Sequence, residues 1–297
     1  MNVVLSRFGV MLVAVACVCG TASADSKALL QEALVAGLEE TVQSVYSSVT
    51  VMREDTVADE DYVSVQLANA TRGNTKGAVV RPAPKREFRM WVEGDKFRLE
   101  AYGIATDGEL REERVFMCDG LHGAMYTRLV PEGMTGGVGY LMSPEQLWGH
   151  LDARQWNLFF DPLPQHALAD AEAAGWKLSL PSDAPKQISG ATTYALDCQH
   201  ELGTTRLSLA PALGFLPVKN ALFGLQGELI CEARVEKTQV FDGVVLPTRW
   251  TQTRYQDGTP VTTTDIEVLE AQFNRDIPDE VFAISFPGDI RVRDSRR

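Results

Sequence analysis

This 297-residue sequence lacks the short motifs that mark the commonest catalytic and nucleotide-binding sites. It contains no GxSxG nucleophile elbow, no HExxH zinc motif and no GxxxxGK(S/T) phosphate loop. Basic residues are outnumbered as well: 28 Lys and Arg stand against 40 Asp and Glu, for a net charge of −12. A chain this acidic repels a phosphate backbone, so we expect no nucleic-acid partner. These absences favour a non-catalytic protein without a cofactor.

Histidine and cysteine, the usual ligands of structural metals, are scarce and scattered. The histidines fall in different predicted elements, so we expect no metal site. They are His122, His150, His166 and His200. Beyond residue 24 the cysteines are Cys118, Cys198 and Cys231. Cys198 and Cys231 both lie in predicted strands and could form a disulfide, but we favour three buried, unpaired thiols.

No run of 18 apolar residues occurs, but a shorter one lies near the N-terminus. Residues 8–19 are uncharged and apolar, follow Arg7, and precede Ala22-Ser23-Ala24, a small-x-small cleavage pattern. The run is too short to span a bilayer. We therefore expect a signal peptide over 1–24, cleavage near Ala24, and export to the periplasm or cell envelope. Cys17 lacks the usual Leu three residues before it, so we do not expect lipid anchoring there.

The remaining residues, 25–297, predict one α+β domain rich in hairpins. Apolar residues at helical spacing predict a helix over 26–46. Ser143 is the expected N-cap of a helix over 144–150, and a third helix is expected over 164–174. An acidic segment over 54–61 is interpreted as a solvated connector, 131–140 as a flexible glycine-rich loop, and the segment from Ile277 as a tail ending in solvated arginines. Strands are predicted over 49–53, 62–68, 85–92, 96–102, 114–118, 122–128, 176–180, 192–200, 204–209, 217–223, 228–241, 245–255 and 261–273.

Several predicted strands carry large apolar side chains at consecutive positions. Residues 88–92, 115–118 and 220–223 show this pattern. A strand with one wet face alternates between apolar and polar residues, so these strands need cover on both faces. Short turns such as Asp119-Gly120 imply antiparallel pairing. The sequence therefore predicts a curved antiparallel sheet with a core on one face and helices or a ligand on the other.

Five segments together resemble the periplasmic lipoprotein-carrier family, the LolA/LolB-like superfamily. They are residues 90–100 (MWVEGDKFRLE), 115–120 (VFMCDG), 207–218 (LSLAPALGFLPV), 241–249 (FDGVVLPTR) and 274–288, which includes IPDEVF and FPG. The resemblance covers 26–294 and implies an unclosed β-barrel, or half-barrel, with helices over an apolar concave face. The better-studied carriers have Arg-Pro ahead of the Phe of this strand. Here those positions hold Glu93 and Gly94, so we assign the family's lid latch to no residue.

The resemblance and the two-faced strands lead to one functional hypothesis: an exported, soluble, non-catalytic carrier of lipid or lipoprotein acyl chains. Its ligand is a lipid or acylated protein, and a membrane-bound donor or acceptor is left open. A second hypothesis is an envelope regulatory or scaffold module that senses lipid or binds a protein; a third is an envelope hydrolase. The side chains expected to line the lipid cavity, each of which could instead be ordinary core, are Met90, Trp91, Phe97, Leu99, Phe116, Met125, Leu222, Phe223 and Trp250.

Overall fold

The computed structural model describes residues 24–43, 47–58, 85–105, 108–129, 136–144, 146–147, 177–200, 203–241 and 244–296. The signal peptide, the expected strand over 62–68 and the expected helix over 164–174 lie outside these residues, apart from Ala24. Of the expected helix over 144–150, residues 144, 146 and 147 are described, and so is its expected N-cap, Ser143. Its backbone N–H donates to the Gln146 side chain (2.9 Å) and its hydroxyl accepts from the Gln146 N–H (3.3 Å), a reciprocal capping box that confirms Ser143 as the N-cap.

The described strands form one open, almost wholly antiparallel sheet. Its hydrogen-bonded order is β15-β6-β5-β4-β3-β2-β1-β14-β13-β12-β11-β10-β9-β7, with β8 paired to β9. Among the described residues, β15 and β7 end this order without pairing to each other, so the sheet is not closed into a barrel. The strands are β1 (Ser47–Ala58), β2 (Lys85–Glu93), β3 (Lys96–Ile104), β4 (Leu110–Asp119), β5 (Gly123–Leu129), β6 (Gly137–Met142), β7 (Lys177–Ser179), β8 (Lys186–Ile188), β9 (Ala191–His200), β10 (Gly203–Ala210), β11 (Leu216–Phe223), β12 (Leu229–Phe241), β13 (Val244–Gln256), β14 (Thr259–Phe273) and β15 (Ile290–Asp294).

The helical elements that the structure describes are few: α2 (Ala24–Gln43), the 3-10 turn η1 (Pro211–Leu213) and α7 (Asp279–Phe282). The expected class, α+β with an unclosed antiparallel sheet and helices, is confirmed. The residues fall into two compact units. The β7–β12 unit comprises 1–44, 153–247 and 255–259, and the β1–β6 unit comprises 45–152, 248–254 and 260–297.

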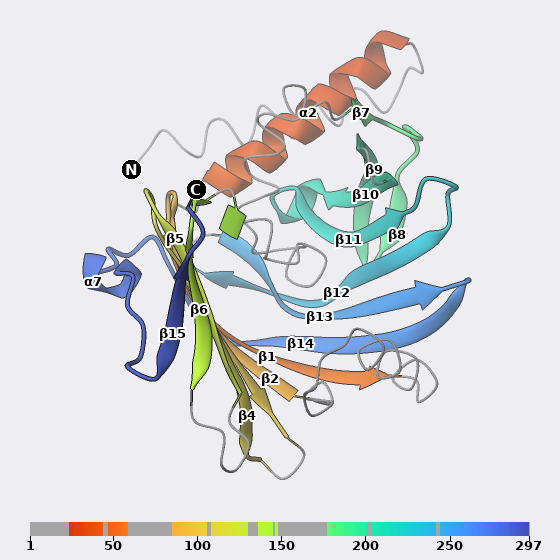
Figure 1. The fold of residues 1–297 in the computed structure, drawn as a ribbon. Helices are drawn as coiled ribbons and strands as arrows, with labels where there is room; N and C mark the ends of the chain where they lie inside the picture. Colours follow the sequence, from red (N-terminus) through yellow and green to blue (C-terminus); the bar gives the residue numbers. More distant parts are fainter. Residues whose placement is uncertain are drawn as a thin grey trace. The chain divides into compact units, whose positions relative to one another are not determined.

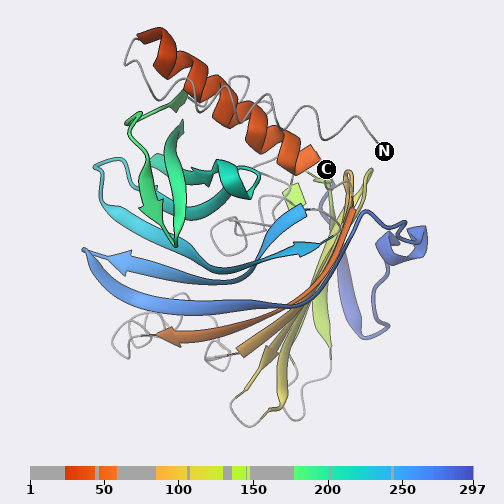
Figure 2. The ribbon, with the colours of Figure 1, turned by 180° about the vertical axis from the view of Figure 1, so that it is seen from behind.

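In the β7–β12 unit, helix α2 covers one face of the strands (Figure 1, Figure 2). Leu30 and Leu34 are buried against Leu196 of β9 and Leu207 of β10, in a core that also includes Phe215. The predicted apolar stripe is confirmed at both leucines. An apolar stripe on a helix is stable only against a complementary apolar surface, and these strands provide it.

Cys118, Cys198 and Cys231 are buried and form no disulfide, as expected. Cys198 lies opposite Thr205, Thr205 opposite Leu222, and Leu222 opposite Cys231, so two strands separate the two thiols. Three strand spacings amount to about 14 Å, whereas a disulfide requires Cα atoms within about 7 Å. Burial raises the pKa of the Cys198 thiol to about 12, which keeps it protonated and unreactive.

In the β1–β6 unit, large side chains are buried on both faces of the sheet. We call one side the Phe97 face, defined by Phe88, Met90, Phe97, Leu99 and Phe116. We call the other the Tyr126 face, defined by Val115, Met117, Ala124 and Tyr126. All nine residues are buried. The prediction of cover on both sides is confirmed for residues 115–118 of β4, whereas Arg89, on the other side of β2, is exposed.

A C-terminal segment, residues 277–294, covers the Tyr126 face (Figure 2). Ile284, Phe286 and Ile290 pack with the residues of that face, and the Phe286 ring lies 6.3 Å from the Tyr126 ring. Phe282 of α7 is 1% exposed. We call residues 277–294 the strap.

The strap corrects two expectations. The segment from Ile277 is not a solvated tail, because it contains α7 and a strand, β15. Residues 137–140 are not a loop, because they belong to β6, whose edge β15 joins in parallel. A short hairpin turn forces two consecutive strands to be antiparallel, but a segment that first crosses a sheet face can pair with the edge strand in either direction. Arg291 and Arg293 are nevertheless exposed, as expected.

Candidate functional site

The Phe97 face brings four of the predicted lining residues into a single row. Met90 of β2 lies opposite Leu99 of β3, Leu99 opposite Phe116 of β4, and Phe116 opposite Met125 of β5. Directly opposed residues project from the same side of a sheet, so these side chains are neighbours. Phe97 stands in the next row, opposite Cys118. The result is a continuous apolar surface four strands wide.

Trp250 joins the same face from β13. The Thr251 hydroxyl donates to Asp265 (2.9 Å), and Asp265 lies opposite Asp55, which points away from the Phe97 face. Successive residues of a strand alternate sides, so Trp250 projects toward the Phe97 face. Trp250 is 4% exposed.

The other three predicted residues do not join this surface. Trp91 follows Met90 directly and therefore projects to the opposite side of β2. Leu222 and Phe223 belong to the β7–β12 unit and, as consecutive residues of β11, project to opposite sides. Leu222 shares a row with Cys198 and Cys231, while the Arg206 guanidinium lies 5.3 Å from the Phe223 ring.

One row of the Phe97 face is charged, and sequence reasoning missed it. Glu54 of β1 lies opposite Arg86 of β2 and Ile266 of β14. The expected acidic connector over 54–61 is thus wrong at Glu54 and Asp55, which belong to β1; residues 59–61 lie outside the described residues. The sequence signal for a strand that continues through this segment was the alternation of its two sides, with Thr50, Met52 and Glu54 on one side and Arg53 and Asp55 on the other. It was obscured because acidic residues usually end strands.

Glu54 is a buried carboxyl, 9% exposed. Burial raises its pKa to about 7, although the attraction of Arg86 and Arg254 opposes the shift. The group therefore exchanges its proton near neutral pH. Two rows away on the same strand, the Thr50 hydroxyl oxygen is buried without a hydrogen-bond partner among the described residues.

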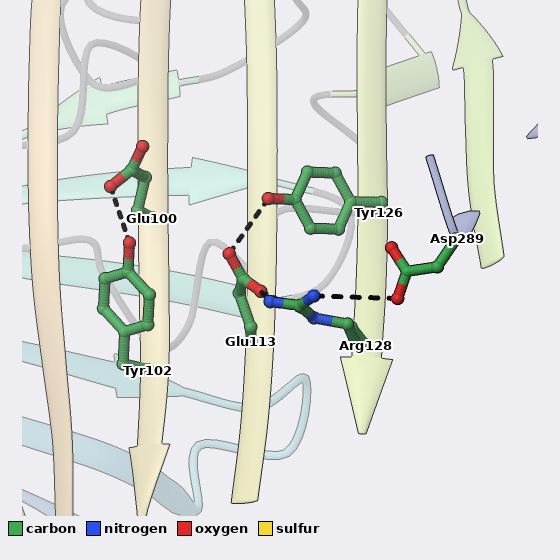
Figure 3. Close-up of polar contacts among 6 residues, drawn as sticks. All are labelled: Glu100, Tyr102, Glu113, Tyr126, Arg128 and Asp289. Carbon is green, nitrogen blue, oxygen red and sulfur yellow. Dashed lines mark hydrogen bonds and ion pairs between the residues drawn. The ribbon is translucent and has the colours of Figure 1, made fainter. Parts of the chain in front are cut away.

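The Tyr126 face carries a polar cluster of its own (Figure 3). Glu113 of β4 accepts hydrogen bonds from the Tyr126 hydroxyl (3.0 Å) and from two Arg128 nitrogens (3.0 and 2.6 Å). Arg128 also lies 3.6 Å from Asp289 of the strap. Burial and the nearby Glu113 raise the pKa of Tyr126 well above its usual value, so its hydroxyl stays a donor. The cluster holds the strap on the sheet.

A second pair beside it has the same character. The Tyr102 hydroxyl donates to Glu100 (2.8 Å), which also accepts from Arg98 (2.7 Å). Burial and Glu100 raise the pKa of Tyr102 to about 12. Arg98 in turn donates to the Val281 carbonyl of the strap at 3.5 Å. These carboxylates are engaged by donors that fasten the strap, so the site that we pursue is the Phe97 face.

Neither a metal site nor a spanning helix emerges from the part of the chain that the structure describes. No group of three or more His, Cys, Asp or Glu residues there has the arrangement of a metal site. His122 lies 3.4 Å from Asp119, while His150 and His166 lie outside the described residues. None of the described helices combines the length and apolarity needed to cross a membrane.

Sequence comparison finds no matching family model and no matching curated protein. Solved structures do match. A DUF1329 family protein from Desulfovibrio piger superposes with a TM-score of 0.52 at 11% identity, covering 86% of this chain and 96% of that one. A domain from Vibrio parahaemolyticus, provisionally assigned as an outer-membrane lipoprotein-sorting protein, gives 0.50 at 10% identity, covering 85% and 97%. The fold is LolA-like.

That likeness confirms the family resemblance at the level of fold. A LolA superfamily protein from Nitrosomonas europaea also matches, with a TM-score of 0.49 and 12% identity over 85% of this chain and 97% of that one. Identities this low establish architecture and carry no information about ligand, because one fold supports many functions.

Proposed function

We propose that this protein is an exported, non-catalytic carrier that holds an acyl chain of a lipid or lipoprotein against the Phe97 face. The proposal treats residues 25–297 as one acyl-binding domain that follows a cleaved signal peptide. The observation that carries it is the row formed by Met90, Leu99, Phe116 and Met125 across four strands. The unclosed LolA-like sheet agrees with this proposal.

Burial of the acyl chain supplies the binding energy without covalent chemistry. Each methylene removed from water contributes about 0.8 kcal/mol, so a ten-carbon segment contributes about 8 kcal/mol before ordering terms are subtracted. Met90 and Met125 suit such a surface because an unbranched thioether adapts to ligands of different shape. Release then requires an acceptor with greater affinity for the chain.

A second candidate, the envelope regulatory or scaffold module, is favoured by a specific observation. Phe97, Leu99 and Phe116 are buried by the protein itself. A permanently packed core would use these side chains for stability alone, and the protein would act through its outer surfaces. The two candidates differ in whether a lipid binds the Phe97 face.

Native mass spectrometry of the exported protein, before and after solvent extraction, tests the carrier directly. We expect a mass excess that extraction removes and that lipid analysis identifies as an acyl-containing molecule. Protein that carries no lipid and that fails to take up the neutral apolar dye N-phenyl-1-naphthylamine would favour the scaffold candidate.

A pair of matched variants locates the binding surface. Met125→Lys and Leu141→Lys place the same ammonium on neighbouring strands, at half-buried positions on opposite faces. We expect Met125→Lys to weaken dye binding at least tenfold, because the ammonium would have to be desolvated against the apolar dye. Leu141→Lys should change dye binding by less than twofold, with thermal unfolding used to show that both variants are folded. Equal effects of the two variants would contradict binding at the Phe97 face.

A further inference from the structure

The Phe97 face changes from apolar to charged along its strands. On β1 the side chains on this face run from Met52 to Glu54, and on β2 from Phe88 to Arg86. The matching row of β4 holds Glu112, which lies opposite Gly103. The three rows that begin at Phe97 are mostly apolar, whereas the fourth is ionic. A surface with this gradient matches an amphiphile better than a pure hydrocarbon.

Two guanidinium groups and one carboxyl meet at the charged end. Glu54 and Arg86 are directly opposed across β1 and β2. Arg254 follows Trp250 by four residues on β13, so alternation places it on the same face. The charge of Arg254 also lowers the pKa of Glu54, which independently places the two groups near each other. All three groups belong to the β1–β6 unit.

Resting on the proposed function, we propose that Arg86 and Arg254 bind the anionic headgroup of the amphiphile whose chain lies along the Phe97 face, and that Glu54 is the internal anion the headgroup displaces. The headgroup chemistry is a carboxylate, phosphate or sulfonate, which guanidinium groups recognise with paired N–H donors. The low exposure of Glu54 strengthens these charge interactions, because little water screens them.

The state of Glu54 sets the strength of this site. When Glu54 is ionised, its charge offsets the two arginines and repels an incoming anion. When it is protonated, two positive charges face the ligand. Among the described residues, the groups that lie opposite Glu54 or act on its charge are Arg86 from β2, Arg254 from β13 and the uncharged Ile266 from β14. Further along the row, Glu112 is paired with Arg114 at 2.6 Å.

Two twelve-carbon probes test the proposal on the wild-type protein. Dodecyl sulfonate has a charge that does not titrate, and dodecanol has none; both are used below micellar concentrations to displace N-phenyl-1-naphthylamine. With the pKa of Glu54 at about 7, the neutral fraction is about nine-tenths at pH 6 and about one-tenth at pH 8. We expect sulfonate affinity to be up to tenfold higher at pH 6, and dodecanol affinity to change by less than twofold.

Three variants identify the groups responsible. Glu54→Gln should bind sulfonate at pH 8 as tightly as wild type does at pH 6, and should lose the pH dependence. Arg86→Gln combined with Arg254→Gln should weaken sulfonate binding at least tenfold and leave dodecanol binding within twofold. Arg89→Gln removes the same charge from an exposed position on the other side of β2 and should leave both affinities within twofold.

The outcomes separate this site from the carrier function. If both probes bind with affinities that neither pH nor the variants alter, the headgroup site is refuted and the acyl carrier stands. If neither probe binds wild-type protein, the carrier function itself is refuted. The wild-type pH comparison needs no substitution, so a variant that fails to fold leaves the proposal decidable.

Discussion

Replacing Glu54 with Gln should make the protein more stable at neutral and basic pH than wild type. In the folded chain, burial raises the pKa of this carboxyl from 4.5 to about 7. The folded state therefore keeps a proton that the unfolded state releases near pH 4.5. The stability that this proton binding supplies is complete below pH 4.5 and is lost as the pH rises through 7. The Glu54→Gln variant has an amide that does not titrate, so this dependence on pH should be absent from it.

The magnitude follows from the size of the shift. A tenfold change in proton affinity corresponds to about 1.4 kcal/mol, so raising the pKa from 4.5 to about 7 corresponds to about 3.5 kcal/mol over the complete titration, of which about 3 kcal/mol falls between pH 4.5 and pH 8. Between pH 4.5 and pH 8, the free energy of unfolding of Glu54→Gln should therefore rise by about 3 kcal/mol relative to that of wild type. The attraction of Arg86 and Arg254 for the ionised carboxylate is already part of that net shift.

Urea unfolding followed by tryptophan fluorescence at several pH values measures this difference. Glu87→Gln is the matched control, because Glu87 is exposed on the neighbouring strand β2. The free energy of unfolding of Glu87→Gln relative to that of wild type should not change with pH. If the free energy of unfolding of Glu54→Gln relative to that of wild type is also independent of pH, Glu54 is solvated in the folded protein and its burial is refuted.

Three further substitutions test the packing. Glu113→Ala should lower the free energy of unfolding by about 2 kcal/mol in urea titrations, because the Tyr126 hydroxyl loses its acceptor and Arg128 its carboxylate; an unchanged midpoint would contradict the role of this cluster. Phe282→Ala should cost about 3 kcal/mol and speed proteolysis within the strap, as judged by the fragments released. Gly37→Ala should destabilise the protein by about 1–3 kcal/mol in thermal melts despite the better helix propensity of Ala, because the added Cβ would overlap the Phe215 ring; a rise in melting temperature would refute that contact.

Residue spacing alone was sufficient to predict the elements whose sequence signals lie within a few neighbouring residues. The leucine repeat of α2 and the Gly-containing turns between β2 and β3 and between β4 and β5 each depend on a few neighbouring residues. The apolar character of both sides of β2 and β4 was also legible, because alternation within one strand defines its two faces. It led to four residues, Met90, Leu99, Phe116 and Met125, that the structure places in one row.

Tertiary structure decided everything that depends on register or on a distant partner. Trp91 is as apolar as Met90, and the two differ only in the side of β2 from which they project. The strap and its parallel strand β15 depend on contacts with β6, which lies far earlier in the chain. Glu54 looks like part of a solvated acidic segment until β2, β13 and β14 surround it. A side chain's chemistry is written in the sequence, but its burial and its neighbours arise from long-range strand pairing, which residue order specifies only collectively.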